Sequence, residues 1–283
     1  MSLSRHGSGV AADVRALASQ VHPVFMLPVL AASLFGSVLS GTFAAVPGLL
    51  HLTAAFFALY TAHVKDGYVD FYYRSEDDDH PLSAHGCRLA LAGSSLGFFA
   101  CLAGLWLTVG PLAAAITLPG WLVAYLHAPQ LDMHPLSATL GYPFGIAVVL
   151  VGGYYVQATA LSGEVLAFAG VFFVVLSGIK VVDDAKDYEF DRSIDKRTVA
   201  VVVGRDRART VAFGLVGTGL LAILALTGTG VFPPSSVGAV VVFLPVAGVA
   251  WRGTEEVATM LLVRGCYLLL AALTVAVYYQ PLA

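Results

Sequence analysis

The sequence predicts an all-α, polytopic membrane protein with nine transmembrane helices. Hydrophobic residues make up 58% of its 283 residues and charged residues only 12%, about half of the roughly 25% that soluble domains carry. Apolar stretches near the ~20 residues that cross a bilayer recur along the whole chain. Almost all Lys and Arg fall on one side of the resulting topology. So little charge cannot cover a water-exposed surface, which excludes a soluble enzyme, a secreted disulfide scaffold and a disordered protein.

Nine apolar segments define the expected spans. They are residues 24–46, 47–64, 86–108, 111–128, 139–160, 163–182, 209–229, 235–251 and 257–279. Pro- and Gly-containing turns separate neighbours, as at 45–48 and 232–235. The polar segment 1–20 lacks the apolar core of a cleavable signal. We therefore expect residues 1–283 to form one integral-membrane domain that begins with a cytoplasmic segment.

The basic residues set the expected orientation. With the N-terminus in the cytoplasm, every Lys and Arg except Arg264 lies in a cytoplasmic segment. This positive-inside pattern predicts a multi-pass protein of the cell membrane with its C-terminus outside. The net charge of −3 gives no general attraction for nucleic acid. Cys87, Cys101 and Cys266 lie in or beside apolar runs and are interpreted as small core residues.

Twelve of the 18 acidic residues fall in two short segments, 63–80 and 180–197. Each follows an even-numbered span, so both are expected on the cytoplasmic side. Asp66 and Asp70 are spaced i, i+4, which places them on one helical face if the second span continues as helix. The run 76–79 is interpreted instead as a solvated acidic surface.

The second segment repeats this spacing. Asp184, Asp187 and Asp191 are spaced i, i+3 and i+7 and would share one face of a continuous helix. Like charges at this spacing repel, and a divalent cation would remove the penalty. Because Mg²⁺ favours a few carboxylates together with water and phosphate oxygens, two facing aspartate sets are expected to hold Mg²⁺ against a diphosphate.

Basic residues are interleaved with the second aspartate set. Lys180, Arg192 and Lys196 suit phosphate recognition. Each is also consistent with a topology signal or with pairing to a neighbouring aspartate.

Two motifs resemble those of the UbiA superfamily of intramembrane prenyltransferases. The run VDDAKDYEFDR at 182–192, continued by Asp195-Lys196-Arg197-Thr198, is similar to the family's ND-x-x-D-x-x-x-D-R and G-K-x-T pattern. The run AHVKDGYVD at 62–70 matches the family's first motif at Asp66 and Asp70 only.

The departures lie mainly in the first half of the chain. Ala62 and His63 stand where the family has Asn and Asp, and His22 stands where it has Arg. Tyr125 with the following Ala128-Pro129 resembles the family's region after the fourth span, but the usual basic residues are missing. These departures leave open a family member whose activity is altered or lost.

The resemblance implies a UbiA-like helical bundle and an electrophilic alkylation within the lipid bilayer. The implied partners are a polyprenyl diphosphate, Mg²⁺ as cofactor and a hydrophobic acceptor. The implied metal ligands are Asp66, Asp70, Asp184, Asp187 and Asp191, of which all except Asp184 are also the expected catalytic residues. The expected substrate-binding residues are Lys180, Arg192, Lys196, His63, Tyr68 and Tyr125. The tyrosine faces would stabilise an allylic cation, and His63 would deprotonate the acceptor or touch phosphate.

The sequence does not decide which acceptor molecule receives the prenyl group, because several branches of the family remain possible. Gly153-Tyr154-Tyr155-Val156-Gln157 resembles the menaquinone-pathway branch, which prenylates dihydroxynaphthoate. Prenyl transfer to lycopene or to an ether-lipid glycerol phosphate is the alternative. An ion-coupled transporter is the competing class, because intramembrane carboxylates often mark ion paths. The clustering of carboxylates at one face favours the transferase.

Overall fold

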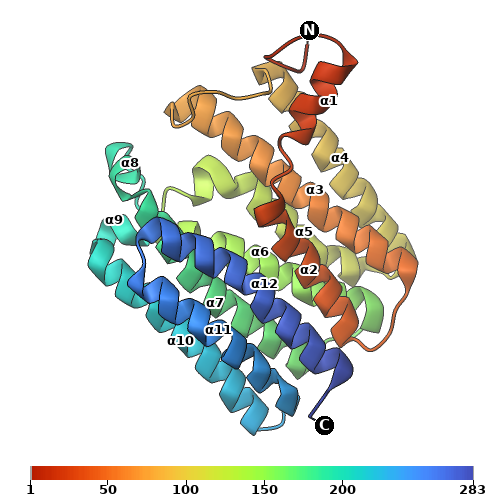
Figure 1. The fold of residues 1–283 in the computed structure, drawn as a ribbon. Coiled ribbons are helices and arrows are strands. Elements are labelled where there is room, and N and C mark those ends of the chain that lie inside the picture. Colours follow the sequence, from red (N-terminus) through yellow and green to blue (C-terminus); the bar gives the residue numbers. More distant parts are fainter. Residues whose placement is uncertain (1, 283) are drawn as a thin grey trace.

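The computed structural model describes residues 2–282, and within that range the chain is helical with no β-strand (Figure 1). The long helices are α2 (Pro23–Leu39), α3 (Ala45–Val69), α4 (Ala84–Thr108), α5 (Pro111–Leu126), α6 (Pro135–Ala158), α7 (Gly163–Lys186), α10 (Arg205–Gly228), α11 (Val237–Arg252) and α12 (Glu255–Tyr279). The short elements are α1 (Val10–Ala18), α8 (Tyr188–Ser193), α9 (Val199–Val203), the π-turns η1 (Asp70–Arg74) and η2 (His127–Leu131), and the 3₁₀ turn η3 (Pro234–Ser236).

The helices match the predicted spans one for one. In the described part of the chain, eight are long and apolar enough to cross a membrane, and a ninth span results if α1 and α2 are counted together. These two helices meet at a bend of 67°. The all-α membrane fold predicted from hydropathy is therefore confirmed.

Helix α7 occupies the middle of the bundle, between α6, α10 and α12 (Figure 1). Two thirds of its most apolar window is buried, a larger share than in the other spans. Phe168 and Phe172 of α7 pack against Phe35 of α2, with ring centroids 5.1 and 6.0 Å apart. The helix that carries the second aspartate set is thus held from several sides.

The second predicted span is longer than its hydropathy indicated. We expected it to end near residue 64, but α3 and η1 form one helical stretch from Ala45 to Arg74. Arg74 lies 3.1 Å from Asp70 and 2.6 Å from Asp132. These ion pairs neutralise Asp70 and Arg74 in the last turns, so the helical stretch continues to Arg74.

The second aspartate set does not lie on one continuous helix, so that expectation is wrong. Helix α7 ends at Lys186, and Asp187 has the non-helical angles φ −96° and ψ 15° before α8 begins. A continuous helix would have stacked like charges along one face, which is unfavourable. The break leaves the Asp187 side chain 44% exposed, while Asp184 and Asp191 are buried.

The N-terminal segment lies across the loop between α3 and α4. Ser4 and Leu82 form an isolated antiparallel bridge. The Arg5 guanidinium lies 4.2 Å from the Phe71 ring centroid and 3.3 Å from Asp79. This segment therefore covers the end of the bundle at which α3 terminates (Figure 1).

Candidate active site

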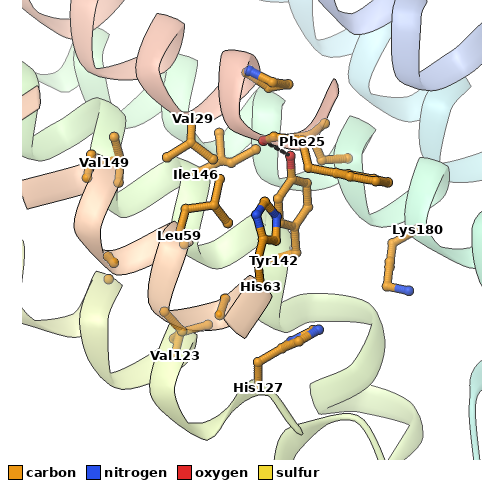
Figure 2. A pocket seen from close by; sticks show the side chains of 18 of the residues that line it. Phe25, Val29, Leu59, His63, Val123, His127, Tyr142, Ile146, Val149 and Lys180 are labelled. Atoms are coloured by element: carbon orange, nitrogen blue, oxygen red, sulfur yellow. Dashed lines mark hydrogen bonds between the residues drawn. The ribbon is translucent and has the colours of Figure 1, made fainter. Parts of the chain in front are cut away.

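A cavity of about 230 Å³ lies among α2, α3, α5, α6, α7 and α12 (Figure 2). Its wall is mostly apolar, with small residues such as Ala55, Ala58 and Gly145 that leave the space open. The polar lining residues are His63, Asp66, His127, Tyr142, Lys180 and Asp183. Because Asp66 belongs to the first motif and Asp183 to the second, the fold brings one end of each motif to the same cavity.

Helix α3 supplies His63 and Asp66, three residues apart on adjoining positions of one face. The His63 ring points into the cavity beside Tyr142 (Figure 2). Its centroid is 4.8 Å from that of His22, and its Nδ1 is buried without a hydrogen-bond partner. The Asp66 carboxylate lies 3.8 Å from the Nε2 of His127. His127, which the sequence analysis missed, therefore belongs to the polar end of the cavity.

Asp70 lies one turn beyond Asp66 and does not line the cavity. It shares Arg74 with Asp132, and these two carboxylate side chains are 16% and 7% exposed. Asp132 follows η2, so the Arg74 guanidinium joins the end of α3 to the loop before α6. The sequence held a signal for this residue, because Asp132 is the sole acidic residue between 80 and 163.

Lys180 is the cationic side chain at the polar end of the cavity. Its Nζ lies 2.5 Å from Asp184 Oδ1 and 3.4 Å from Asp183 Oδ2. In Figure 2 it extends toward the same space as His127, from the opposite wall. Asp183, which occupies the family's Asn position, is thus a lining residue that our list of expected site residues omitted.

Lys196 neutralises the buried Asp191. Its Nζ lies 3.0 Å from Asp191 Oδ1. Burial disfavours the charged form of Lys196 and so lowers its pKa. The attraction of the Asp191 carboxylate outweighs this effect, so the pKa of Lys196 lies above its ordinary value. Asp187 instead lies near Lys186 at 3.6 Å. Arg192 is exposed and forms no ion pair with any residue from 2 to 282.

Glu76 lies beside the first motif. Burial and the Asp70 carboxylate raise its pKa to about 7, while Lys196 acts in the opposite direction. All four residues of the acidic run 76–79 are nevertheless exposed, as expected for a solvated surface. Asp79, the last member, pairs with Arg5 and His6 of the N-terminal segment.

The structure does not bring the two expected tyrosines to the cavity wall. Tyr68 packs near Tyr72 and faces Tyr73, with the two hydroxyl oxygens 3.3 Å apart. Tyr125 stacks on Trp121 with ring centroids 5.0 Å apart. The Lys65 ammonium lies 4.2 Å from the Tyr125 ring centroid. Lys65 of α3 thus places a positive charge near the region where the family's usual basic residues are missing.

The buried carboxylate oxygens near the cavity are of the chemical type that binds a hard cation such as Mg²⁺. Asp132 Oδ1, Asp184 Oδ2 and Asp191 Oδ2 are buried without hydrogen-bond partners, whereas Asp191 Oδ1 is ion-paired with Lys196. Carboxylate oxygens of this kind suit Mg²⁺, which completes its coordination with water and phosphate oxygens. Within residues 2–282, no three His, Cys, Asp or Glu side chains already surround one point. The described residues thus offer buried carboxylate oxygens of the kind that Mg²⁺ prefers, but no assembled metal site.

A model of the UbiA prenyltransferase family matches residues 82–260, nearly two thirds of the chain. The chain belongs to this family. As a UbiA-type protein it is an intramembrane prenyltransferase with several membrane-spanning helices. No curated protein sequence gives a significant match.

Solved structures of UbiA proteins share the fold at low identity. A UbiA homologue from Aeropyrum pernix K1 superposes with a TM-score of 0.72 at 18% identity, over 89% of this chain and 96% of the homologue. A digeranylgeranylglyceryl phosphate synthase gives 0.71 at 14% identity, over 94% and 99%. A UbiA homologue from Archaeoglobus fulgidus bound to GPP and Mg²⁺ gives 0.67 at 12% identity, over 95% and 99%. The matches span nearly the whole UbiA fold.

Proposed function

We propose that this protein transfers a polyprenyl group from a prenyl diphosphate to a lipophilic or aromatic acceptor, with Mg²⁺ as cofactor. The observation that carries the proposal is the cavity, because its long apolar wall ends in side chains from both aspartate motifs. An apolar chain fits the wall, and a charged head group fits the polar end. The Mg²⁺-bound and GPP-bound homologue has the same fold.

The charged residues divide into two roles. Asp66, Asp70, Asp184, Asp187 and Asp191 are the proposed ligands of the metal–diphosphate complex. When bound, Mg²⁺ would neutralise the charge that develops on the departing diphosphate. Lys180, Lys196 and Arg192 are proposed to add fixed positive charge for the same oxygens.

The cation formed on the prenyl group must meet the acceptor away from water. The apolar wall excludes water from the reacting carbon, and His63 and Tyr142 lie inside the cavity (Figure 2). His63 Nδ1 has no hydrogen-bond partner, so it is a proposed acceptor of the proton that the alkylated acceptor releases. The expected cation-stabilising role of Tyr68 has no support from this arrangement, since Tyr68 lies outside the lining.

Two classes of acceptor fit the proposal. The motif at 153–157 supports dihydroxynaphthoate, as in menaquinone synthesis. Similarity to a digeranylgeranylglyceryl phosphate synthase supports an ether-lipid glycerol phosphate. The active site is proposed to open to the cytoplasm, since the basic loops lie at the same end as the aspartates.

Alanine substitution tests the carboxylates. Asp66→Ala, Asp70→Ala, Asp187→Ala and Asp191→Ala are each expected to lower Mg²⁺-dependent transfer by at least about 100-fold, because removal of a ligand weakens charge neutralisation in the transition state. The measurement is incorporation of radiolabelled prenyl diphosphate into extracted lipid by membranes that contain the enzyme.

The matched control is Asp78→Ala. Asp78 is an exposed aspartate of the same loop region and forms no ion pair in residues 2–282. It should retain wild-type activity, and all variants should insert at wild-type levels. Full activity of Asp187→Ala would contradict its assignment as a metal ligand.

A further inference from the structure

Arg264 is a charged residue on an exposed face of a membrane-spanning helix. It lies nine residues into α12, which places its Cα ~13 Å along the axis from Glu255 at 1.5 Å per residue. Its exposed neighbours one turn away, Met260 and Leu268, are apolar. Among residues 2–282, no carboxylate forms an ion pair with Arg264. A guanidinium in such surroundings is unfavourable, and a bound anion offsets this cost, as contact with interfacial water also does.

Arg264 also lies beside the wall of the candidate active site. Val263 and Cys266, on the adjoining face of α12, line the cavity. The hydroxyl of Tyr267 donates to the carbonyl of Val24 and joins α12 to the start of α2. Phe25, the next residue of α2, lines the cavity and is nevertheless 40% exposed. The contact between α2 and α12, here called the α2–α12 seam, therefore runs beside cavity-lining residues of both helices, and the exposed Arg264 lies three residues before Tyr267 on α12.

We propose that Arg264 recognises the anionic group of the acceptor as it enters the cavity from the bilayer along the α2–α12 seam. A guanidinium forms paired hydrogen bonds with a carboxylate or a phosphate, and the lipid surroundings strengthen such a contact. The inference rests on the proposed transfer reaction and narrows its acceptor. It selects an amphiphile with a carboxylate or phosphate over a neutral polyene such as lycopene.

Paired acceptors that differ only in charge test this inference. The probes are dihydroxynaphthoate against dihydroxynaphthalene, and geranylgeranylglyceryl phosphate against geranylgeranylglycerol. Their binding to the full-length protein is measured in nanodiscs of zwitterionic phospholipid, and no turnover is needed. Arg264→Gln is expected to weaken binding of the anionic member of at least one pair about tenfold and to leave its neutral partner within about twofold. Arg264→Lys should retain most of the selectivity.

Two controls separate the possible sources of the effect. Arg252→Gln removes an exposed arginine at the end of α11, away from the cavity lining, and should not change selectivity. Nanodiscs with added phosphatidylglycerol test whether bulk anionic lipid is the ligand. Equal loss for both members of each pair, no loss for either, or full competition by phosphatidylglycerol would overturn the inference.

Radiolabelled prenyl transfer with the same acceptors distinguishes this inference from the proposed function. Charge-selective binding without any product in the wild type would support Arg264 as the recognition point and contradict the transfer reaction. Product formation with unchanged selectivity in Arg264→Gln would contradict the Arg264 assignment alone.

Discussion

His80 shows how burial sets the chemistry of one residue in the loop between α3 and α4. It is 3% exposed, its Nδ1 lies 3.1 Å from the Leu82 carbonyl oxygen and 3.2 Å from the Leu82 amide nitrogen, and its buried Nε2 has no partner. Burial lowers the pKa of His80 and Arg5 acts in the same direction, whereas the hydrogen bond to the Leu82 backbone and the charges of Asp77 and Asp79 oppose this shift. The neutral ring is therefore the form that the folded protein accommodates.

This loop should lose stability in mild acid. The folded-state pKa of His80 lies below the unfolded value of 6.5. Just below pH 6.5 the unfolded chain is therefore protonated at His80 while the native state is still neutral there. The contribution to stability is present above pH 6.5 and is lost as the pH falls below it. We expect His80→Asn, whose side-chain oxygen can still accept from the Leu82 amide, to show a smaller decrease in unfolding temperature between about pH 7.5 and 5.5.

Differential scanning fluorimetry of the detergent-solubilised protein measures this effect. His134→Asn is the control, since His134 is exposed and its replacement should leave the wild-type pH dependence intact. The same acid-induced decrease in His80→Asn as in the wild type would show that another group titrates.

At the residue level, the aspartate motifs were predictable and their partners were not. Spacing and charge identified Asp66 and Asp191, because carboxylates are conspicuous in an apolar chain. His127 and Asp132 meet the α3 end only after α5 folds back against it, as the 3.8 Å separation of His127 and Asp66 shows. The prediction that Tyr68 faces the substrate was wrong, because a residue two positions from Asp66 lies on a different side of the helix. Its ring packs on the α4 side of α3.

At the element level, close contact between α2 and α6 shapes the cavity. A Cβ on Gly153 would lie 2.2 Å from the Ser33 carbonyl oxygen, and one on Gly36 would lie 2.1 Å from that of Leu150. Small residues permit such close backbone approach in membrane bundles. Phe25 and Val29 of α2 and Ile146 of α6 line the cavity nearby, so the spacing of this helix pair fixes two of its walls.

Gly153→Ala should therefore disturb both stability and the cavity. The added methyl group meets backbone, which cannot rotate away, so we expect a loss of about 1–3 kcal/mol and a lower unfolding temperature. Gly214→Ala in α10 is the matched control, since a Cβ there meets nothing within 4 Å. Equal unfolding temperatures for the two variants would show that α2 and α6 separate without cost.

Hydropathy predicted where helices exist better than where they end. The ends of α3 and α7 depend on charge: α3 continues because Arg74 neutralises Asp70 and Asp132, and α7 stops before Asp187. The end of α3 depends on Asp132, which another element contributes, and the end of α7 depends on repulsion between aspartates on one helical face. A hydropathy average over a window of the sequence records neither of these two interactions.

At the scale of the whole molecule, the helix order places the basic loops and both aspartate motifs at one end. The positive-inside rule assigns this end to the cytoplasm, and the loop between α2 and α3 to the outside. Cysteine labelling can test this assignment with little background, because Cys87, Cys101 and Cys266 are all buried. Phe43 is 74% exposed in that outer loop, and Arg252 is exposed at the opposite end.

We expect a membrane-impermeant maleimide to label Phe43→Cys in intact cells and to label Arg252→Cys only after lysis. The physical reason is that the basic segments at the same end of the bundle as residue 252 are unfavourable to translocate, whereas the loop at residue 43 carries no charge to retain it. Tyr279→Cys, at the exposed end of α12, should label like Phe43→Cys, because the long helices α3, α4, α5, α6, α7, α10, α11 and α12 between them form an even number of spans, which returns the chain to the same side. Labelling of Arg252→Cys in intact cells would invert the topology and place the aspartate end outside. Label at residue 43 but not at 279 would instead show that one of the helices between them does not cross the bilayer.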